Sequence, residues 1–136
     1  MSAQVIEVVP IVLKNVTFKV AADEYQKNVS QVEFVPSASA VNWKGLHKDA
    51  VFTDIGSATW VCNLSYAQDW ATTDSLSRYL FEHEGEAVDV EFAPEVSGPS
   101  FTATLLVTPG SIGGTVDAVA VGTVSLGVRG RPVFVP

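Results

Sequence analysis

The second half of the chain carries a dense run of carboxylates that could do chemistry. Paired carboxylates act as general acid and base in glycoside hydrolysis when they face each other across a cleft in different environments. Asp89 and Glu91 are instead two residues apart in an alternating segment, which places both on one face of a strand. The pattern therefore favours a solvated or interface surface, with a weak cation site as the lesser alternative. Within fourteen residues that contain no lysine or arginine, the run comprises Glu82, Glu84, Glu86, Asp89, Glu91 and Glu95.

Cys62, the single cysteine, could act as a nucleophile with His47 or His83 as its base. Its place in the alternation of Trp60 and Leu64 predicts a buried thiol instead. His83 falls near the end of a predicted helix, where a histidine interacts favourably with the last carbonyls. One cysteine also allows neither an intramolecular disulfide nor a thiolate zinc cage. We expect no catalytic residue, no cofactor and no metal site.

Aromatic and glycine-rich segments suggest two further kinds of binding site. Trp43, Trp60 and Trp70 could form a sugar-stacking platform, but in so small a domain we expect two of the three in the core and Trp43 exposed. The segment PGSIGG at 109–114 lacks the Lys-Ser/Thr that completes a phosphate-binding loop. The sequence therefore predicts no small-molecule substrate and no enzyme, and a carbohydrate-binding β-sandwich remains the alternative.

Composition and charge narrow the class of protein. The chain has 136 residues, 47% of them apolar and 17% charged, with a formal net charge of −7. This length and apolar content predict one folded domain over 1–136. The negative charge disfavours binding to nucleic acid through phosphates, which needs clustered lysine and arginine. The sequence shows neither a signal-peptide pattern nor a membrane-spanning stretch, so we expect synthesis in the cytoplasm and no membrane partner.

Period-two alternation of β-branched and aromatic residues dominates the chain, and it predicts strands with one buried face. Turn signals separate the segments, notably at 94–99 and 109–114. The fold class expected is mainly β, a β-sandwich or split barrel of two packed sheets. The alternating segments are 16–20, 29–36, 60–66, 88–92, 100–108 and 118–128.

One segment, at about 73–84, has helical spacing instead. Thr72, Thr73 or Asp74 could cap its first turn, and Gly85 suits the position after its last turn. We expect one amphipathic helix that flanks the sheets. Its apolar stripe comprises Leu76, Tyr79, Leu80 and His83.

The segment at about 38–57 is the least regular, and it predicts a long loop or an extended hairpin, the kind of segment that is usually functional. Terminal segments are loose unless a neighbour holds them, so 1–9 and 129–136 are candidate arms. A β domain without a ligand site has sheet edges that must be covered, so self-association is the default expectation.

Five segments in this order resemble the major tail protein, or tail tube protein, of long non-contractile-tailed bacteriophages (siphophages), most of all those of actinobacterial phages. The resemblance extends from about Tyr25 to the end of the chain. Its most specific combination is a tryptophan-ending strand, a DSLSRYL helix ending at a glycine, an acidic strand, and PGSIGG. The segments are VNWKGL (41–46), ATWVCNLSYAQDW (58–70), DSLSRYLFEHEGEAVDVEFAP (74–94), GPSFTATLLVTPGSIGG (98–114) and VDAVAVGTVSLGVRGRPVFV (116–135).

The resemblance implies a structural virion protein located in the phage tail. Members of that family form hexameric rings, which stack into a tube along a tape measure protein between tail initiator and terminator proteins. The tube then conducts double-stranded DNA, without specific binding, during DNA ejection into the host. Near alternatives are a tail terminator, a distal tail protein and an Hcp-like injection tube component. The family has no catalytic motif that could be transferred to this chain.

The resemblance also gives site candidates. An acidic wall repels phosphates and lets DNA slide, so Asp89 and Glu91, with Glu86 nearby, are the predicted lumen-facing residues. The 38–57 segment corresponds in position to the long loop that reaches the neighbouring ring in similar proteins. Inter-ring contacts are therefore predicted at Trp43, His47 and Asp54.

Overall fold

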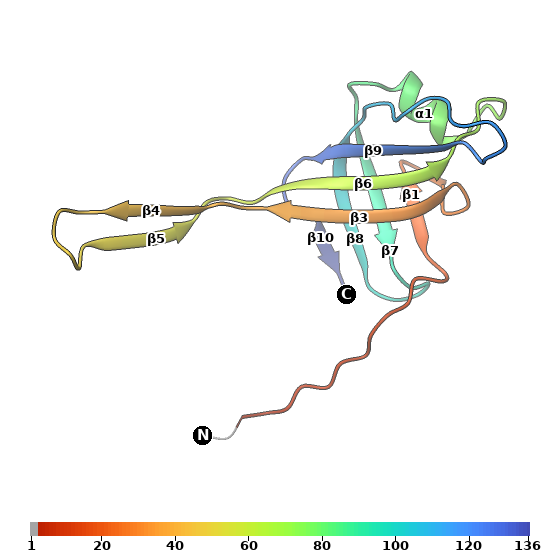
Figure 1. Ribbon diagram of the computed structural model, residues 1–136. Coiled ribbons are helices and arrows are strands. Elements are labelled where there is room, and N and C mark those ends of the chain that lie inside the picture. Colours follow the sequence, from red (N-terminus) through yellow and green to blue (C-terminus); the bar gives the residue numbers. More distant parts are fainter. Residues whose placement is uncertain (1–2) are drawn as a thin grey trace.

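Residues 3–136 are described by a computed structural model, and within them lie ten strands and one helix (Figure 1). The strands are β1 (Thr17–Val20), β2 (Asp23–Glu24), β3 (Val29–Ser37), β4 (Ala40–Lys44), β5 (Val51–Ile55), β6 (Thr59–Ala67), β7 (Ala87–Ala93), β8 (Ser100–Leu106), β9 (Val121–Val128) and β10 (Val133–Val135). The helix is α1 (Leu76–Glu82).

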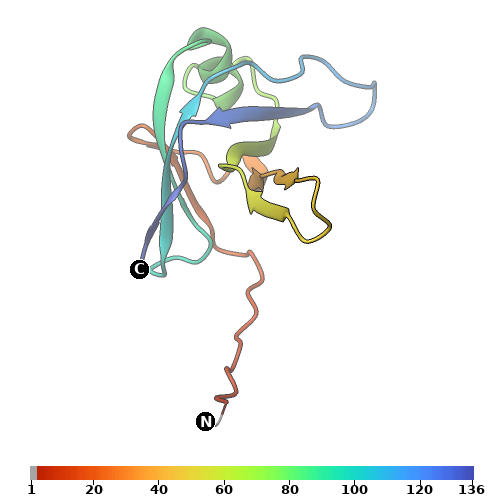
Figure 2. The same ribbon diagram turned by 90° about the vertical axis from the view of Figure 1, so that its left-hand side faces the viewer.

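Eight strands form one antiparallel sheet in the order β2-β1-β7-β8-β9-β6-β3, with β10 paired to β8. Between β8 and β9 the register comprises two pairs, at Leu105 and Leu106, and β10 lies beside the first half of β8. The sheet bends at this short junction, so β7 and β8 form one layer and β3, β6 and β9 the other (Figure 2). The predicted mainly β fold, a sandwich or split barrel with one flanking helix, is confirmed.

The core lies between the two layers and is built by the alternating residues. Phe34 of β3 and Phe92 of β7 meet across it, with ring centroids 6.2 Å apart, although these strands are distant in the sheet order. Cys62 is fully buried, as predicted, and burial raises the pKa of its thiol to about 12. The buried apolar residues are Phe18, Val20, Tyr25, Cys62, Leu64, Tyr66, Leu76, Leu80, Val90, Phe92, Ala93, Leu105, Val107 and Leu126.

Two glycines let the buried Tyr66 ring pack against the backbone. A Cβ atom at Gly122 would lie 2.7 Å from two ring carbons, and one at Gly110 would overlap the hydroxyl oxygen. Any other residue at these positions would push the ring out of the core. The PGSIGG segment therefore includes a packing position as well as a turn.

Helix α1 is shorter than the predicted 73–84, and the predicted caps Thr72, Thr73 and Asp74 are wrong. The cap is Ser75, whose hydroxyl accepts a hydrogen bond from the Arg78 N–H at 3.4 Å. The later start of the helix is explained by the residues that precede it. The Asp69 carboxylate accepts hydrogen bonds from two backbone N–H groups at 3.1 Å, which holds the chain before Ser75 in a turn. The two N–H groups belong to Ala71 and Thr72.

The apolar stripe of α1 packs on the body as predicted. Leu76 and Leu80 are buried, and the Tyr79 ring stacks on that of His83 at 4.2 Å. Gly85 has φ +87° but does not take the predicted position directly after the helix, because His83 is the C-cap and Gly85 lies two residues beyond it, where its N–H donates to the Val107 carbonyl at 2.8 Å. In the described chain no helix is long and apolar enough to cross a membrane.

The 38–57 segment is a two-stranded hairpin, β4–β5, that projects from the body (Figure 1). It prolongs β3 and β6, and the register changes at the junction. Two residues, Ala38 and Ser39, lie opposite three residues at 56–58, which is the signature of a β-bulge.

The chain termini differ from each other. Residues 3–16 form neither strand nor helix; their first part runs away from the body, whereas the Asn15 carbonyl accepts a hydrogen bond from the Val96 N–H at 3.1 Å and Val16 packs against the core. Residues 1 and 2 of the predicted arm 1–9 lie outside the described residues. The C-terminal candidate arm, 129–136, includes β10, which pairs with β8 as part of the body.

Candidate assembly surfaces

The β4–β5 hairpin with its turn, residues 40–55, is called the arm below. Its register pairs Trp43 with Phe52 and Val41 with Asp54 on one face. The side chains of Trp43 and Phe52 are 62% and 57% exposed. The opposite face also presents exposed apolar residues, Val51 and Ile55 among them. Both faces of the thin ribbon thus present exposed apolar side chains, and on the second face these lie beside the polar pair Asn42 and Thr53.

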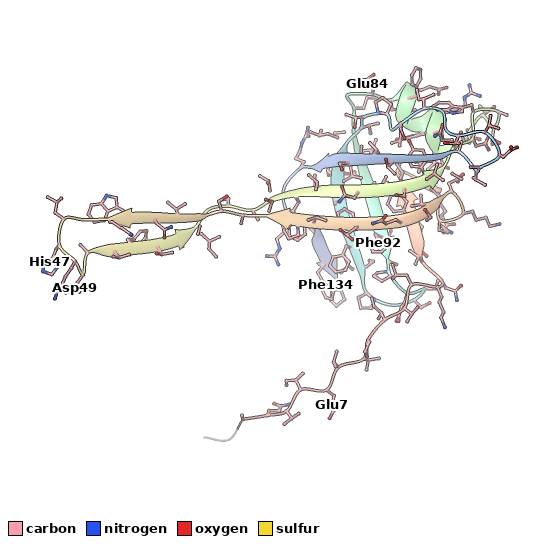
Figure 3. All side chains as sticks on the ribbon, in the orientation of Figure 1. Glu7, His47, Asp49, Glu84, Phe92 and Phe134 are labelled. Carbon is pink, nitrogen blue, oxygen red and sulfur yellow. The ribbon has the colours of Figure 1, made fainter. Side chains whose placement is uncertain are left out.

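Hydrogen bonds order the turn at the end of the arm. The Asp49 N–H donates to His47 Nδ1 at 3.1 Å, and the Ala50 N–H donates to the His47 carbonyl at 3.0 Å. Leu46 is fully exposed beside them. Figure 3 shows His47 and Asp49 at the far end of the arm. This tip is a defined turn that presents an apolar side chain to solvent.

The three predicted inter-ring residues therefore lie on one element. Trp43 and Asp54 share a face of the arm, and His47 lies at its tip. A two-stranded ribbon alone is marginally stable in water, and an exposed apolar surface of this kind usually marks a contact site. Their role in contacts between rings stays a prediction.

A second surface is the outer face of the β1–β7–β8 layer, called the charged face below. Glu91 lies opposite Lys19 of β1, and the Asp89 carboxylate accepts a hydrogen bond from the Thr104 hydroxyl at 2.8 Å. Arg129 and Arg131, which follow β9, line the same shallow groove as the two carboxylates. The local charge is therefore mixed and not acidic throughout.

Glu86 does not share that face. It lies in the turn after α1, where its N–H donates to the His83 carbonyl at 3.1 Å and its carbonyl accepts from the Val107 N–H at 2.9 Å. Burial, together with the negative charge of Glu86, raises the pKa of the Tyr79 hydroxyl. The structure thus brings together two of the three candidate lumen residues and places the third at the helix end. Whether any of them lines a channel stays a prediction.

The outer face of the β3–β6–β9 layer, called the neutral face below, is built differently. Asn63 lies opposite both Glu33 and Ser125, and the Ser125 hydroxyl donates to the Asn63 side-chain carbonyl at 2.6 Å. Glu33 is the single charged residue within the described bounds of these three strands. This face therefore carries hydroxyl and amide groups together with a few valines and one charge.

A groove between the layers was missed by sequence reasoning, because its rings come from five different strands. It has a volume of about 710 Å³ and lies in the lower part of the body in Figure 3, where Phe92 and Phe134 are labelled. Phe101 and Phe134 pack edge to face at 5.3 Å. We call it the aromatic groove; it is lined by Phe34, Trp60, Phe92, Phe101, Arg131, Pro132, Val133 and Phe134.

The expected core positions for two of the three tryptophans are wrong. Trp60 is half-buried in the wall of the aromatic groove, and Trp70 is 41% exposed, with its ring against the edge of Phe81 at 6.1 Å. The indole is the largest side chain and is seldom buried in full, and although the core takes Phe and Tyr rings, both indoles lie at its rims. Trp43 is exposed, as predicted, on the arm.

No arrangement for catalysis is formed by the residues singled out for it. Cys62 is buried in β6, His47 lies at the tip of the arm, and the His83 ring nitrogen Nδ1 lies 3.0 Å from the Tyr79 carbonyl at the end of α1. Among residues 3–136, no group of three or more histidine, cysteine or acidic side chains could hold a metal ion.

Comparison with known proteins gives a match in fold and none in sequence. The chain matches no model of a protein family and no curated protein sequence. Among solved structures, it is similar to a chain described as "Virion of native gene transfer agent (GTA) particle", with a TM-score of 0.66 and 14% sequence identity. The likeness covers 90% of this chain and 96% of that one. At this identity it shows a common fold.

Proposed function

We propose that this chain is a structural virion protein, the subunit of a phage tail tube in which hexameric rings stack around a channel for DNA. The observation that carries the proposal is the match in fold, over nearly the whole of both chains, to a component of a gene transfer agent virion. The resemblance of the sequence to tail tube proteins supports the same role. In this role the chain is not an enzyme, and its main partner is itself.

The arm supports assembly by stacking. It extends Trp43, Asp54 and His47 away from the body, and its apolar side chains are exposed on both faces. A neighbouring ring would bury them and stabilise a ribbon that is marginal by itself. Contact with tape measure, initiator and terminator proteins would then fix the length and the ends of the tube.

Electron microscopy of the purified protein at high concentration tests this function. We expect rings or hollow filaments with a regular axial repeat and a channel wide enough for a DNA duplex. Single rings that never stack would favour a terminator or distal tail protein. If monomers persist even with tape measure and initiator proteins present, the tube proposal fails, and binding to a glycan array would instead support a carbohydrate-binding module.

The charged face is the candidate lining of the channel, through Asp89 and Glu91. A phage carrying Asp89→Lys with Glu91→Lys should assemble tails but eject DNA poorly, because lysines on the wall would hold the phosphates. Asn63→Lys with Ser125→Lys is the matched pair on the neutral face and should leave ejection unchanged. The opposite result, with ejection blocked only by the second pair, would place the channel at the neutral face.

A further inference from the structure

The aromatic groove has an open strand edge beside it. Within residues 3–136, β10 pairs with β8 alone, so its other edge has no strand partner. Phe134 faces the groove with Phe101, whereas Arg131 and Val133 lie along both this groove and the charged face. An added strand would find backbone partners at β10, the rings of the groove on one side, and Arg131 at the border between the groove and the charged face.

The N-terminal segment 3–14 has the matching pattern. Its apolar residues are exposed, and it makes no strand with its own body. In an extended conformation Ile6 and Val8 point to one side, and Glu7 points to the other between Val5 and Val9. Figure 3 shows Glu7 well away from Phe92 and Phe134 of the same chain.

We propose that the segment 3–14 of one copy of this chain pairs with the free edge of β10 in a second copy. Ile6 and Val8 then cover the aromatic groove, and Glu7 meets Arg131 on the opposite side of the added strand. The Ile6 side of the segment then meets the rings of the groove, and the Glu7 side, which also carries Val5 and Val9, meets Arg131 and the exposed valines of β10, Val133 and Val135.

The contact joins two different surfaces and is therefore heterologous. Such contacts repeat from copy to copy and close into rings or continue as filaments. The inference rests on the proposed function in this respect, since it supplies one of the bonds that a ring or tube needs. Within the segment 3–14, strand pairing is then confined to residues 3–9, because Pro10 lacks the N–H that a strand ladder requires.

A peptide of residues 3–14 tests the contact without requiring a tube. Fluorescence anisotropy of the labelled peptide, titrated with the full-length protein, should show saturable binding. Ile6→Asp with Val8→Asp in the peptide should weaken binding more than about tenfold, while Val5→Asp with Val9→Asp, on the other side of the strand, should cost much less. Absence of binding up to about 1 mM protein, or equal losses for the two pairs, overturns the proposal.

Charge exchange identifies the partner of Glu7. Glu7→Lys in the peptide or Arg131→Glu in the protein should each weaken binding roughly threefold, and the two together should restore it. Both side chains are exposed, so neither substitution threatens the fold. If the losses of affinity from Glu7→Lys and Arg131→Glu simply add when the two are combined, Glu7 and Arg131 do not contact each other.

Assembly of mixed chains distinguishes pairing of the segment with a second copy from pairing within the same chain. Full-length Glu7→Lys and Arg131→Glu chains should each assemble poorly alone and well when mixed, because every contact between the two kinds of chain is then matched. A segment that folded back on its own groove would stay mismatched, and mixing would rescue nothing. If the wild-type protein forms no ring or filament, the tube proposal fails, while the peptide titration still decides the contact.

Discussion

The body and the arm are made from the same kind of sequence, yet they bury it differently. In β6, alternation places Cys62, Leu64 and Tyr66 against the opposite layer, where they are buried. In β4 and β5, alternation pairs Trp43 with Phe52, and both remain exposed. Alternation predicts a strand with an apolar face but not whether the chain itself supplies the cover. In the arm, the chain itself leaves the apolar side chains uncovered.

This difference predicts that substitutions in the two regions have separate effects. Changes in the body should alter the free energy of unfolding, because the contacts they remove lie within one chain. Under the proposed function, changes in the arm should alter association, because the contacts that they would remove are contacts with a neighbouring chain. The three predictions below test this separation, from the largest expected effect on stability to the smallest.

Leu105→Ala should lower the free energy of unfolding by roughly 2–5 kcal/mol, because it leaves a cavity at the junction where the sheet bends. The side chain of Leu105 is 1% exposed, whereas that of its neighbour Leu106 is 39% exposed. Leu106→Ala is thus a matched control for which a loss below about 1 kcal/mol is expected. Urea denaturation followed by circular dichroism measures both; equal losses would show that the junction is not part of the core.

The stability of the body should fall in alkaline solution. Burial raises the pKa of Cys62 from 9.0 to about 12 and is also the main cause that raises the pKa of Tyr25 from 10.0 to about 12. In the unfolded chain these groups lose their protons first, so the free energy of unfolding is unaffected below pH 9 and decreases as the pH rises from 9 to 12.

Denaturation at a series of pH values measures this dependence. Cys62→Ala should remove the part of the decrease that begins near pH 9, and Tyr25→Phe the part that begins near pH 10. Trp43→Ser, in the arm, removes no ionisable group and should leave the slope unchanged. A slope identical in wild type and Cys62→Ala would mean that the thiol is accessible in the folded state.

Trp43→Ser combined with Phe52→Ser should change the free energy of unfolding by less than about 0.5 kcal/mol, because both side chains are already solvated in the single chain. The same variant should abolish rings and filaments in electron microscopy. Asn42→Ser with Thr53→Ala, on the other face of the same arm, is the control. This control variant should assemble more readily than the Trp43→Ser, Phe52→Ser variant. A large loss of stability in the first variant would show that the arm folds against its own body.

Local patterns predicted most of the body, and long-range pairing explains most of what they missed. Alternation identified the strands and the burial of Cys62, since both depend on near neighbours in sequence. The helix was predicted too long because the turn held by Asp69 ends only at Ser75, a competition between side-chain and helix hydrogen bonds that spacing does not show.

The surfaces were harder to predict than the core. The acidic run seemed to form an unbroken negative patch, yet strand pairing brings Lys19 beside Glu91, and the chain after β9 adds Arg129 and Arg131. The aromatic groove likewise collects rings from strands that are far apart in sequence. In both cases the register of distant strands, which single-sequence patterns do not encode, decides which side chains become neighbours.

The continuity of the arm with the body has a mechanical consequence. Because β4 and β5 prolong β3 and β6, a pull on the tip of the arm is transmitted along the axis of β6. That strand is joined to β9 by eight residue pairs, from Trp60 with Val128 to Ala67 with Val121. Their hydrogen bonds lie across the direction of the pull and are loaded together in shear, not opened one after another. Tension along the arm would thus be resisted by all the residue pairs along the length of the β6–β9 ladder.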